Sequence, residues 1–310
     1  MRKSAALTLT LLSPFTAEFL LADQYLAGPP ELVQQLVMFA LYVAFYGAAA
    51  LLIRETVRRT GRGWPTMLTL ALAFGVFEEG LLTQTLFNPH YLGLDLLSSG
   101  HVPVLGIGGP WTVYVLTLHV VWSIGAPIAI TEALFGREPW LKKAGVSLWS
   151  VTLVLGAAAT FGVSYAMGHF LAHPAQLAGA AVVVVALVVA AFRFRSAVWT
   201  STPGNPWVAL ALGVGASSAF QLLRGLDSLP WLLVGLLLAL EAATAVAILR
   251  LRPPAFPLAA GAVLTYCWIG MKTTIPHGTI AIVEQSVLIL VAVALLVVTS
   301  RSTRPLAGNS

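Results

Sequence analysis

Charge is scarce in this chain: of its 310 residues only 9% are Asp, Glu, Lys or Arg. Soluble domains carry about 25% charged residues, and a water-soluble fold cannot bury a chain that is 58% hydrophobic. The scarcity of charge therefore excludes a soluble enzyme and a soluble binding module. Cysteine is scarcer still. The single residue, Cys267, lies in an apolar run, which excludes a disulfide framework and a metal site built from cysteines.

Apolar runs of about 20 residues recur along the whole chain, and each is long enough as a helix to cross a hydrocarbon core of about 30 Å. The sequence therefore predicts an all-α protein in a lipid bilayer, a single polytopic helix bundle over residues 1–310. The first run resembles a cleaved signal peptide, but we interpret it as a helix because its end, Leu20-Leu21-Ala22, lacks the small residue expected at the earlier position of a cleavage site. A cleaved leader is the alternative. We expect ten spans, at about residues 4–22, 32–53, 65–87, 111–135, 146–168, 176–194, 206–223, 230–249, 256–271 and 280–300.

The basic residues test this count of spans. With the N-terminus inside, fifteen of the 17 Lys and Arg residues fall in inside segments, and only Arg224 and Lys272 fall outside. This asymmetry is typical of the positive-inside rule. We therefore expect both termini in the cytoplasm and a plasma (inner) membrane location. Because the positive charge is explained by orientation in the membrane, the sequence predicts no nucleic-acid partner.

One outside loop, residues 88–110, is much longer than the others. It contains glycine and proline but no Lys or Arg, and it is apolar. Irregular backbone at membrane depth needs cover from protein or from a wet cavity. The loop is therefore either a lid or re-entrant segment over the neighbouring spans, or an ordinary interfacial loop.

Two adjacent carboxylates, Glu78 and Glu79, interrupt an apolar span. An ionised group there costs several kcal/mol unless it is compensated, which indicates a functional residue. At 1.5 Å per residue both lie roughly 12 to 14 Å below the outer end of their helix, and His119 lies about as deep in the next one. Thr83 and Ser123 each lie one turn away, on the faces of Glu79 and His119. The sequence predicts a catalytic site of Glu78, Glu79 and His119; the alternative is a polar network that only fixes helix packing.

Further polar residues fall in or near the spans, and we expect Glu18, Glu241 and Glu284 to extend the polar interior. The pair His169 and His173 has the i, i+4 spacing that places two imidazoles on one helix face, where they could bind a metal. Interfacial histidines without a metal are the alternative. The sequence indicates no particular cofactor, and a divalent metal stays open.

The Glu78-Glu79 pair, followed by a helical His119 on the next span, resembles the CPBP (CAAX protease and bacteriocin-processing, or Abi) family of intramembrane proteases. Thr83 stands where that family has an arginine, Val115 stands where it has a phenylalanine, and its third histidine motif has no counterpart here. The resemblance implies a hydrolase whose first glutamate activates water to cleave a membrane-embedded peptide.

A secondary transporter is the alternative to a hydrolase, because the number of helices and the position of the termini also fit that class. Ten helices with both ends inside are similar to the drug/metabolite transporters, whose halves are five-helix repeats of inverted topology. In such a proton-coupled carrier of a small molecule, Glu78 and Glu79 are expected to face Glu241 near the interface of the repeats. A scaffold without turnover is a third possibility.

Overall fold

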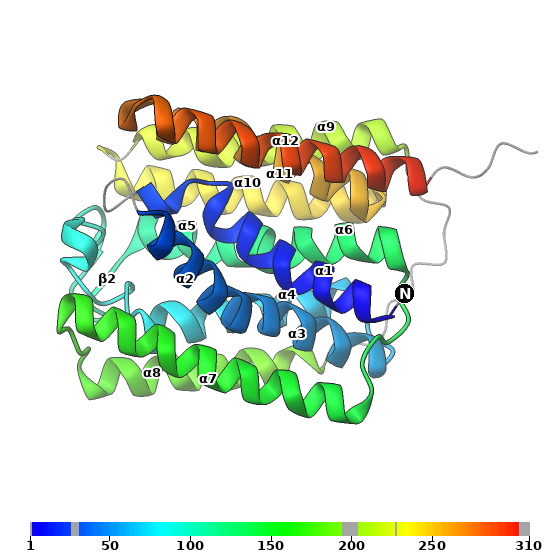
Figure 1. Ribbon diagram of the computed structural model, residues 1–310. Coiled ribbons are helices and arrows are strands. Elements are labelled where there is room, and N and C mark those ends of the chain that lie inside the picture. Colours follow the sequence, from blue (N-terminus) through cyan, green and yellow to red (C-terminus); the bar gives the residue numbers. More distant parts are fainter. Residues whose placement is uncertain (1, 26–30, 194–203, 227, 304–310) are drawn as a thin grey trace, which may run out of the picture.

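The computed structural model describes residues 2–25, 31–193, 204–226 and 228–303. The chain is 81% helical. Figure 1 shows its long helices side by side and roughly parallel in one bundle. The α-helices are α1 Arg2–Pro14, α2 Leu32–Tyr42, α3 Ala48–Arg59, α4 Trp64–Phe77, α5 Gly109–Leu118, α6 Ala126–Phe135, α7 Lys143–Gly168, α8 Pro174–Ala191, α9 Pro206–Leu223, α10 Pro230–Leu251, α11 Ala255–Thr274 and α12 Thr279–Ser302.

Shorter elements join and extend these helices. Four are π-helical: η1 Phe15–Phe19, η3 Val43–Gly47, η4 Glu78–Leu82 and η6 His119–Gly125. Four are 3-10 helices: η2 Asp23–Tyr25, η5 Tyr91–Gly93, η7 Arg224–Leu226 and η8 Ile275–His277. The two strands are β1 His101–Val102 and β2 Ile107–Gly108.

Within the described residues, nine helices are long and apolar enough to cross a membrane. They correspond to the second through tenth predicted spans, which confirms a polytopic all-α fold. The first predicted span is helical too, but it carries Arg2, Lys3 and Glu18 and is not one of the nine. It still belongs to the bundle, because Ala5 and Leu9 are fully buried.

The two ends of the bundle differ. Figure 1 shows that α1 begins and α12 ends at the same end, which we call the N-terminal end, whereas β2 lies at the opposite end, which we call the hairpin end. A chain that begins and ends at the same end of the bundle crosses the membrane an even number of times, in agreement with the ten predicted spans. That the N-terminal end faces the cytoplasm stays a prediction.

The third predicted span, at residues 65–87, is wrong at its end, because the helix stops at Leu82. Gln84 adopts a φ of 57°, and the backbone N–H groups of Phe87 and Asn88 both bond to its carbonyl oxygen at 2.9 Å. This turn folds the chain back over the helix end. Glu78 and Glu79 therefore lie in the last turn of their helix and not 12 to 14 Å below its end, as we expected from the rise per residue.

The long loop at residues 88–110 is an ordered cap. Its strands β1 and β2 form an antiparallel hairpin that pairs His101 with Gly108. Gln176 of α8 donates to the carbonyl oxygen of Leu105 at 3.1 Å and holds the hairpin against the bundle. Val104 at the tip is 95% exposed. The loop lies at the hairpin end of the bundle (Figure 1), and its Leu97 is buried.

The helices that carry the predicted site are the innermost ones. About 61% of the spans Trp64–Leu82 and Gly109–Phe135 is buried, against 17% for α7 and 11% for α8 and α10. Two apolar clusters meet at η6: Trp122 stacks on Tyr266 with ring centroids 4.3 Å apart, and Ile124 packs with Met67 in the other cluster. His119 thus begins a segment that packs against both apolar clusters.

A buried ion network closes the N-terminal end. Arg54 is fully buried, and its guanidinium bonds to Glu55 at 2.8 Å and Glu132 at 3.0 Å. The carbonyl oxygens of Gly136 and Glu138 both accept from its Nη2 atom, at 3.1 Å and 2.9 Å. Because every nitrogen of the guanidinium has a partner, this network is a structural connection between α3, α6 and the chain that follows.

Candidate functional site

Several polar residues of the bundle interior lie on π-helical turns. Among the described residues, η1 carries Glu18, η3 carries Tyr46, η4 carries Glu78 and Glu79, and η6 begins at His119. A π turn holds one residue more than an α turn and is common at functional sites. The extra residue changes which side chains face inward, so the four segments together turn these polar groups toward one another.

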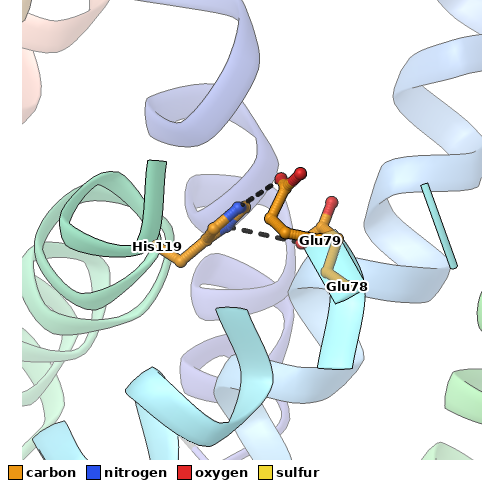
Figure 2. A group of neighbouring side chains, drawn as sticks. All are labelled: Glu78, Glu79 and His119. Carbon is orange, nitrogen blue, oxygen red and sulfur yellow. Dashed lines mark hydrogen bonds and ion pairs between the residues drawn. The ribbon is translucent and has the colours of Figure 1, made fainter. Parts of the chain in front are cut away.

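Glu78, Glu79 and His119 form the centre of the site (Figure 2). The Nε2 atom of His119 lies 2.7 Å from Oε1 of Glu79, and its Nδ1 atom lies 3.4 Å from Oε2 of Glu78. All three residues are at most 6% exposed. The structure thereby brings together the three residues that the sequence predicted; their catalytic role stays a prediction.

Glu79 is held by three donors. Its Oε2 atom accepts a hydrogen bond from Thr83 at 3.1 Å and another from Thr85, while its Oε1 atom faces Nε2 of His119. The indole N–H of Trp111 donates in turn to the Thr85 hydroxyl at 3.1 Å. A carboxyl group surrounded only by donors acts as an ionised acceptor. Glu79 therefore fixes the position of the imidazole ring.

Glu78 has a different environment from its neighbour. Tyr46 donates to its Oε1 atom, whereas its Oε2 atom is buried and has no hydrogen-bond partner among the described residues. The 3.4 Å contact of Oε2 with His119 does not meet hydrogen-bond geometry. A buried polar atom without a partner costs about 1 to 3 kcal/mol. This oxygen is therefore the atom of the site that is open to a water, a proton or a ligand.

Close helix contacts hold the histidine in place. A Cβ atom on Gly75 would lie 3.1 Å from Cβ of His119, so only glycine lets α4 approach η6 this closely without displacement. On the opposite side, the Ser13 hydroxyl of α1 donates to the carbonyl oxygen of Ser123 at 2.6 Å. Gly75 thus packs directly against His119, and the bond from Ser13 ties the segment η6 to α1.

The turn that follows η4 covers the site at the hairpin end. Ser164 of α7 donates to the carbonyl oxygen of Thr83 at 3.1 Å, and the amide of Ala172 donates to the side chain of Gln84 at 2.7 Å. Tyr91 of η5 faces the same site from the loop: burial raises its pKa, and the negative charge of Glu79 raises it further. The long loop therefore contributes directly to the surroundings of the glutamates.

The same three residues are the ones that could hold a metal. Glu78, Glu79 and His119 each offer one ligand atom, and these atoms lie within 4.8 Å of one another. Two ligands of a tetrahedral zinc, each about 2.0 Å from the ion, lie about 3.3 Å apart. The 2.7 Å contact between His119 and Glu79 is shorter and fits a hydrogen bond. A metal would have to break this contact, so we derive no step through one.

The histidine pair expected on one helix face does not lie on one. Helix α7 ends at Gly168, His169 follows in the left-handed conformation, and α8 begins only at Pro174. His173 caps α8, its Nδ1 atom accepting from the amide of Ala175 at 3.2 Å. The expectation that this spacing presents two imidazoles side by side was therefore wrong, because the helix ends before the second histidine.

The remaining predicted polar residues fall into two groups. Thr83, Ser123 and Glu18 belong to the site: Ser123 lies 3.3 Å from Nδ1 of His119, and Glu18 interacts with the Tyr46 hydroxyl. Two others bond elsewhere. The carboxylate of Glu241 accepts from Thr117 at 2.6 Å, and that of Glu284 accepts from Tyr25 at 2.5 Å and from Gln35 at 3.3 Å.

Several residues of the site were not predicted from the sequence. Tyr46 and Trp111 lie in or beside apolar runs, where aromatic residues are common and carry no special signal. The run Thr83-Gln84-Thr85 was the available signal, since polar residues within two turns of a buried glutamate pair need hydrogen-bond partners there.

The fold and this cluster define a polytopic α-helical membrane protein with carboxylates and an imidazole buried among its central helices. A family described as an uncharacterized membrane protein family matches residues 7–305. The chain belongs to that family. Comparison with curated proteins and with solved structures found no match.

Proposed function

We propose that this protein is an intramembrane hydrolase that cleaves a membrane-embedded peptide, with Glu78 as the general base toward water. The observation that carries the proposal is the buried Oε2 atom of Glu78, which has no hydrogen-bond partner and lies 3.4 Å from Nδ1 of His119. A general base needs such a free oxygen within hydrogen-bond reach of the water it activates.

The neighbouring residues have roles that follow from their contacts. Water bonded to Oε2 of Glu78 gives up a proton to this carboxylate as its oxygen attacks the peptide carbonyl carbon. A His119 protonated on both ring nitrogens stabilises the charge that develops on the carbonyl oxygen and then gives its Nδ1 proton to the leaving amine, and Glu78 returns the proton taken from water to Nδ1. Glu79 holds the ring through Nε2 at 2.7 Å, which leaves Nδ1 directed at Glu78 and Ser123. The resemblance of Glu78, Glu79 and His119 to the CPBP proteases supports the same reaction class.

The test needs no known natural substrate. Full-length protein in lipid vesicles is incubated, in water enriched in ¹⁸O, with a panel of single-span membrane peptides, and the products are weighed by mass spectrometry. We expect cleaved products that carry ¹⁸O at the new carboxyl end for the wild type and none for Glu78→Gln. Equal cleavage by the two proteins, or no cleavage of any peptide by the wild type, contradicts the proposal.

A proton-coupled carrier is the second candidate. It is supported by Glu241 of α10, whose carboxylate bonds to Thr117 two residues before His119 on the same continuous helix. A change in the protonation of Glu241 would therefore act on the helix that carries the histidine. Vesicle uptake that is unaffected by Glu79→Gln combined with Glu241→Gln would count against a carrier.

A further inference from the structure

Helix α11 has one face inside the bundle and another at its surface. Val263 and Tyr266 pack in an apolar cluster of the interior, whereas Trp268 and Lys272, one turn apart, are exposed. Because α11 belongs to a span that crosses the bilayer, the side chains of its outer face meet lipid. A molecule that binds to this outer face therefore approaches it from the membrane.

An open, apolar groove lies on this outer face, where α11 packs against α12. The groove has a volume of about 400 Å³ and is lined by Cys267, Trp268, Met271 and Lys272 of α11, Ile275 of η8 and Ile289 of α12. The indole N–H of Trp268 donates to the Ser218 hydroxyl of α9 at 3.3 Å, which fixes the orientation of this lining ring. Met271 has a flexible, unbranched side chain that adapts to a ligand of irregular shape. The groove therefore suits a flexible apolar chain.

The lining changes from charged to apolar with depth. Helix α12 begins at the hairpin end (Figure 1), and η8 joins it to the end of α11, so the two helices meet at that end of the bundle. Lys272 lies in the last turn of α11. Cys267 lies about 10 Å and Ile289 about 15 Å from the ends of their helices, by the rise per residue of an α-helix. The ammonium group of Lys272 is thus level with lipid headgroups, and the apolar part of the groove is level with acyl chains.

The charge of Lys272 is not neutralised within the described residues, because its ammonium group forms no hydrogen bond and no ion pair there. Among the described basic residues, the directions of the helices place only Lys272 and Arg224 at the hairpin end. Arg224 has a partner, since its guanidinium carbon lies 4.2 Å from the centre of the Tyr114 ring. Lys272 is therefore the described cation of this end that is available to an anion from outside the protein.

We propose that this groove binds an anionic phospholipid, with one acyl chain between α11 and α12 and the phosphate of the headgroup at Lys272. Basic residues at pockets between membrane helices bind anionic headgroups in this way. The net negative charge of such a headgroup is complementary to the unpaired ammonium group, whereas a zwitterionic headgroup brings a cation of its own. The proposal goes beyond the proposed function, because the groove lies on α11 and α12 and not on the helices that carry Glu78 and His119.

The experiment uses Trp268 as a reporter inside the groove. The full-length protein is reconstituted in phosphatidylcholine vesicles that contain a small fraction of either phosphatidylglycerol or phosphatidylcholine with brominated acyl chains, which quench tryptophan on contact. The fluorescence difference between wild type and Trp268→Phe reports Trp268 alone. We expect phosphatidylglycerol to bind beside Trp268 about fivefold more tightly than phosphatidylcholine, which is the contribution of one basic residue near the membrane surface. Lys272→Gln should remove this preference and leave phosphatidylcholine binding unchanged.

Two matched controls separate the groove from the rest of the surface. Arg224→Gln removes the other described basic residue of the hairpin end, which does not line the groove, and should keep the preference. Ile289→Phe fills the deep end of the groove and should lower quenching by both lipids, whereas Leu290→Phe, at a neighbouring position that is 68% exposed and outside the lining, should not.

Three results overturn the proposal. The first is equal quenching of wild-type Trp268 by the two brominated lipids, and the second is an unchanged preference in Lys272→Gln or an equal loss in Arg224→Gln. The third is a Trp268 that neither lipid quenches, which would assign the groove to a second copy of the chain. Peptide cleavage is measured separately, so failure of the lipid site leaves the hydrolase untouched, and failure of the hydrolase leaves the lipid site untouched.

Discussion

The Nε2 atom of His119 lies 2.7 Å from Oε1 of Glu79, in a contact that connects the two innermost helices of the bundle. The imidazole lies closer to Glu79 than to Glu78, although the two glutamates are adjacent in the sequence. The two adjacent glutamates therefore have different tasks. Glu79 is saturated with donors, whereas Glu78 keeps one oxygen without a partner.

This difference predicts unequal effects on stability. In Glu79→Gln an amide donor replaces one of the two acceptor oxygens. This donor faces other donors, either the hydroxyls of Thr83 and Thr85 or the N–H of His119. We therefore expect the free energy of unfolding to fall by about 2 to 3 kcal/mol. In Glu78→Gln the amide group takes the place of the oxygen that has no partner. We expect an unchanged or higher stability for that variant. Thermal unfolding in detergent, with wild type in parallel, measures both.

The prediction is tested most directly by which of the two variants unfolds at the lower temperature. A retained buried charge at a functional site lowers stability, and its removal raises it. If Glu78→Gln unfolds several degrees below Glu79→Gln, Glu78 is a packing residue, and both the hydrolase and the carrier lose their main support.

A second prediction concerns the close contact at Gly75. A Cβ atom there would lie 3.1 Å from Cβ of His119 and 3.3 Å from its ring, so Gly75→Ala has to displace the histidine. Overpacking of this kind costs about 1 to 3 kcal/mol, and we expect peptide cleavage to fall with it. Gly162→Ala is the matched control, since nothing lies within 4 Å of a Cβ on Gly162 of α7. Alanine is the better helix former by about 1 kcal/mol, so this control should be neutral or more stable. Equal stability and equal peptide cleavage in Gly75→Ala and Gly162→Ala would contradict the close contact between Gly75 and His119.

The sequence predicted the helices and the central triad well because both depend on one-dimensional signals. Apolar length defines a span, and equal depth on neighbouring antiparallel helices placed His119 against one of the two glutamates without indicating which. The prediction reached the right contact although the end of the glutamate helix was wrong by five residues. The error did not matter because the π turns at η4 and η6 turn the side chains inward independently of where the helix ends.

What the sequence did not reveal depends on local backbone geometry. The left-handed conformation of Gln84 directs Thr85 back onto Glu79, yet glutamine seldom adopts this conformation and gives no warning of it. Tyr46 looks like any aromatic residue in an apolar span until η3 turns its hydroxyl toward Glu78. Similarly, the spacing of His169 and His173 predicted a shared helix face only on the assumption that α7 continued past Gly168.

A third prediction separates water from serine as the nucleophile. The Ser123 hydroxyl lies 3.3 Å from Nδ1 of His119, and Glu79 holds the other ring nitrogen, so the three could act as a serine triad. Because Ser123 also lies one turn after His119 on the same helix, we interpret the contact as a local one. We expect Ser123→Ala to retain cleavage within about threefold of wild type, against a loss of about 10²-fold or more for Glu78→Gln. Loss of cleavage in Ser123→Ala would indicate that the serine hydroxyl, and not water, is the nucleophile.

The last prediction concerns the ion network at the N-terminal end. Arg54→Ala leaves Glu55 without its closest cation and removes one of the two arginines bonded to Glu132, the other being Arg58 at 2.6 Å. Breaking a buried ion pair on one side costs about 3 to 5 kcal/mol, so we expect Arg54→Ala to unfold at a much lower temperature. Arg137→Ala is the matched control: this arginine is 68% exposed and lies 3.9 Å from Glu132, and exposed pairs contribute about 0 to 1 kcal/mol. Equal unfolding temperatures for Arg54→Ala and Arg137→Ala would contradict a stabilising role of the buried network.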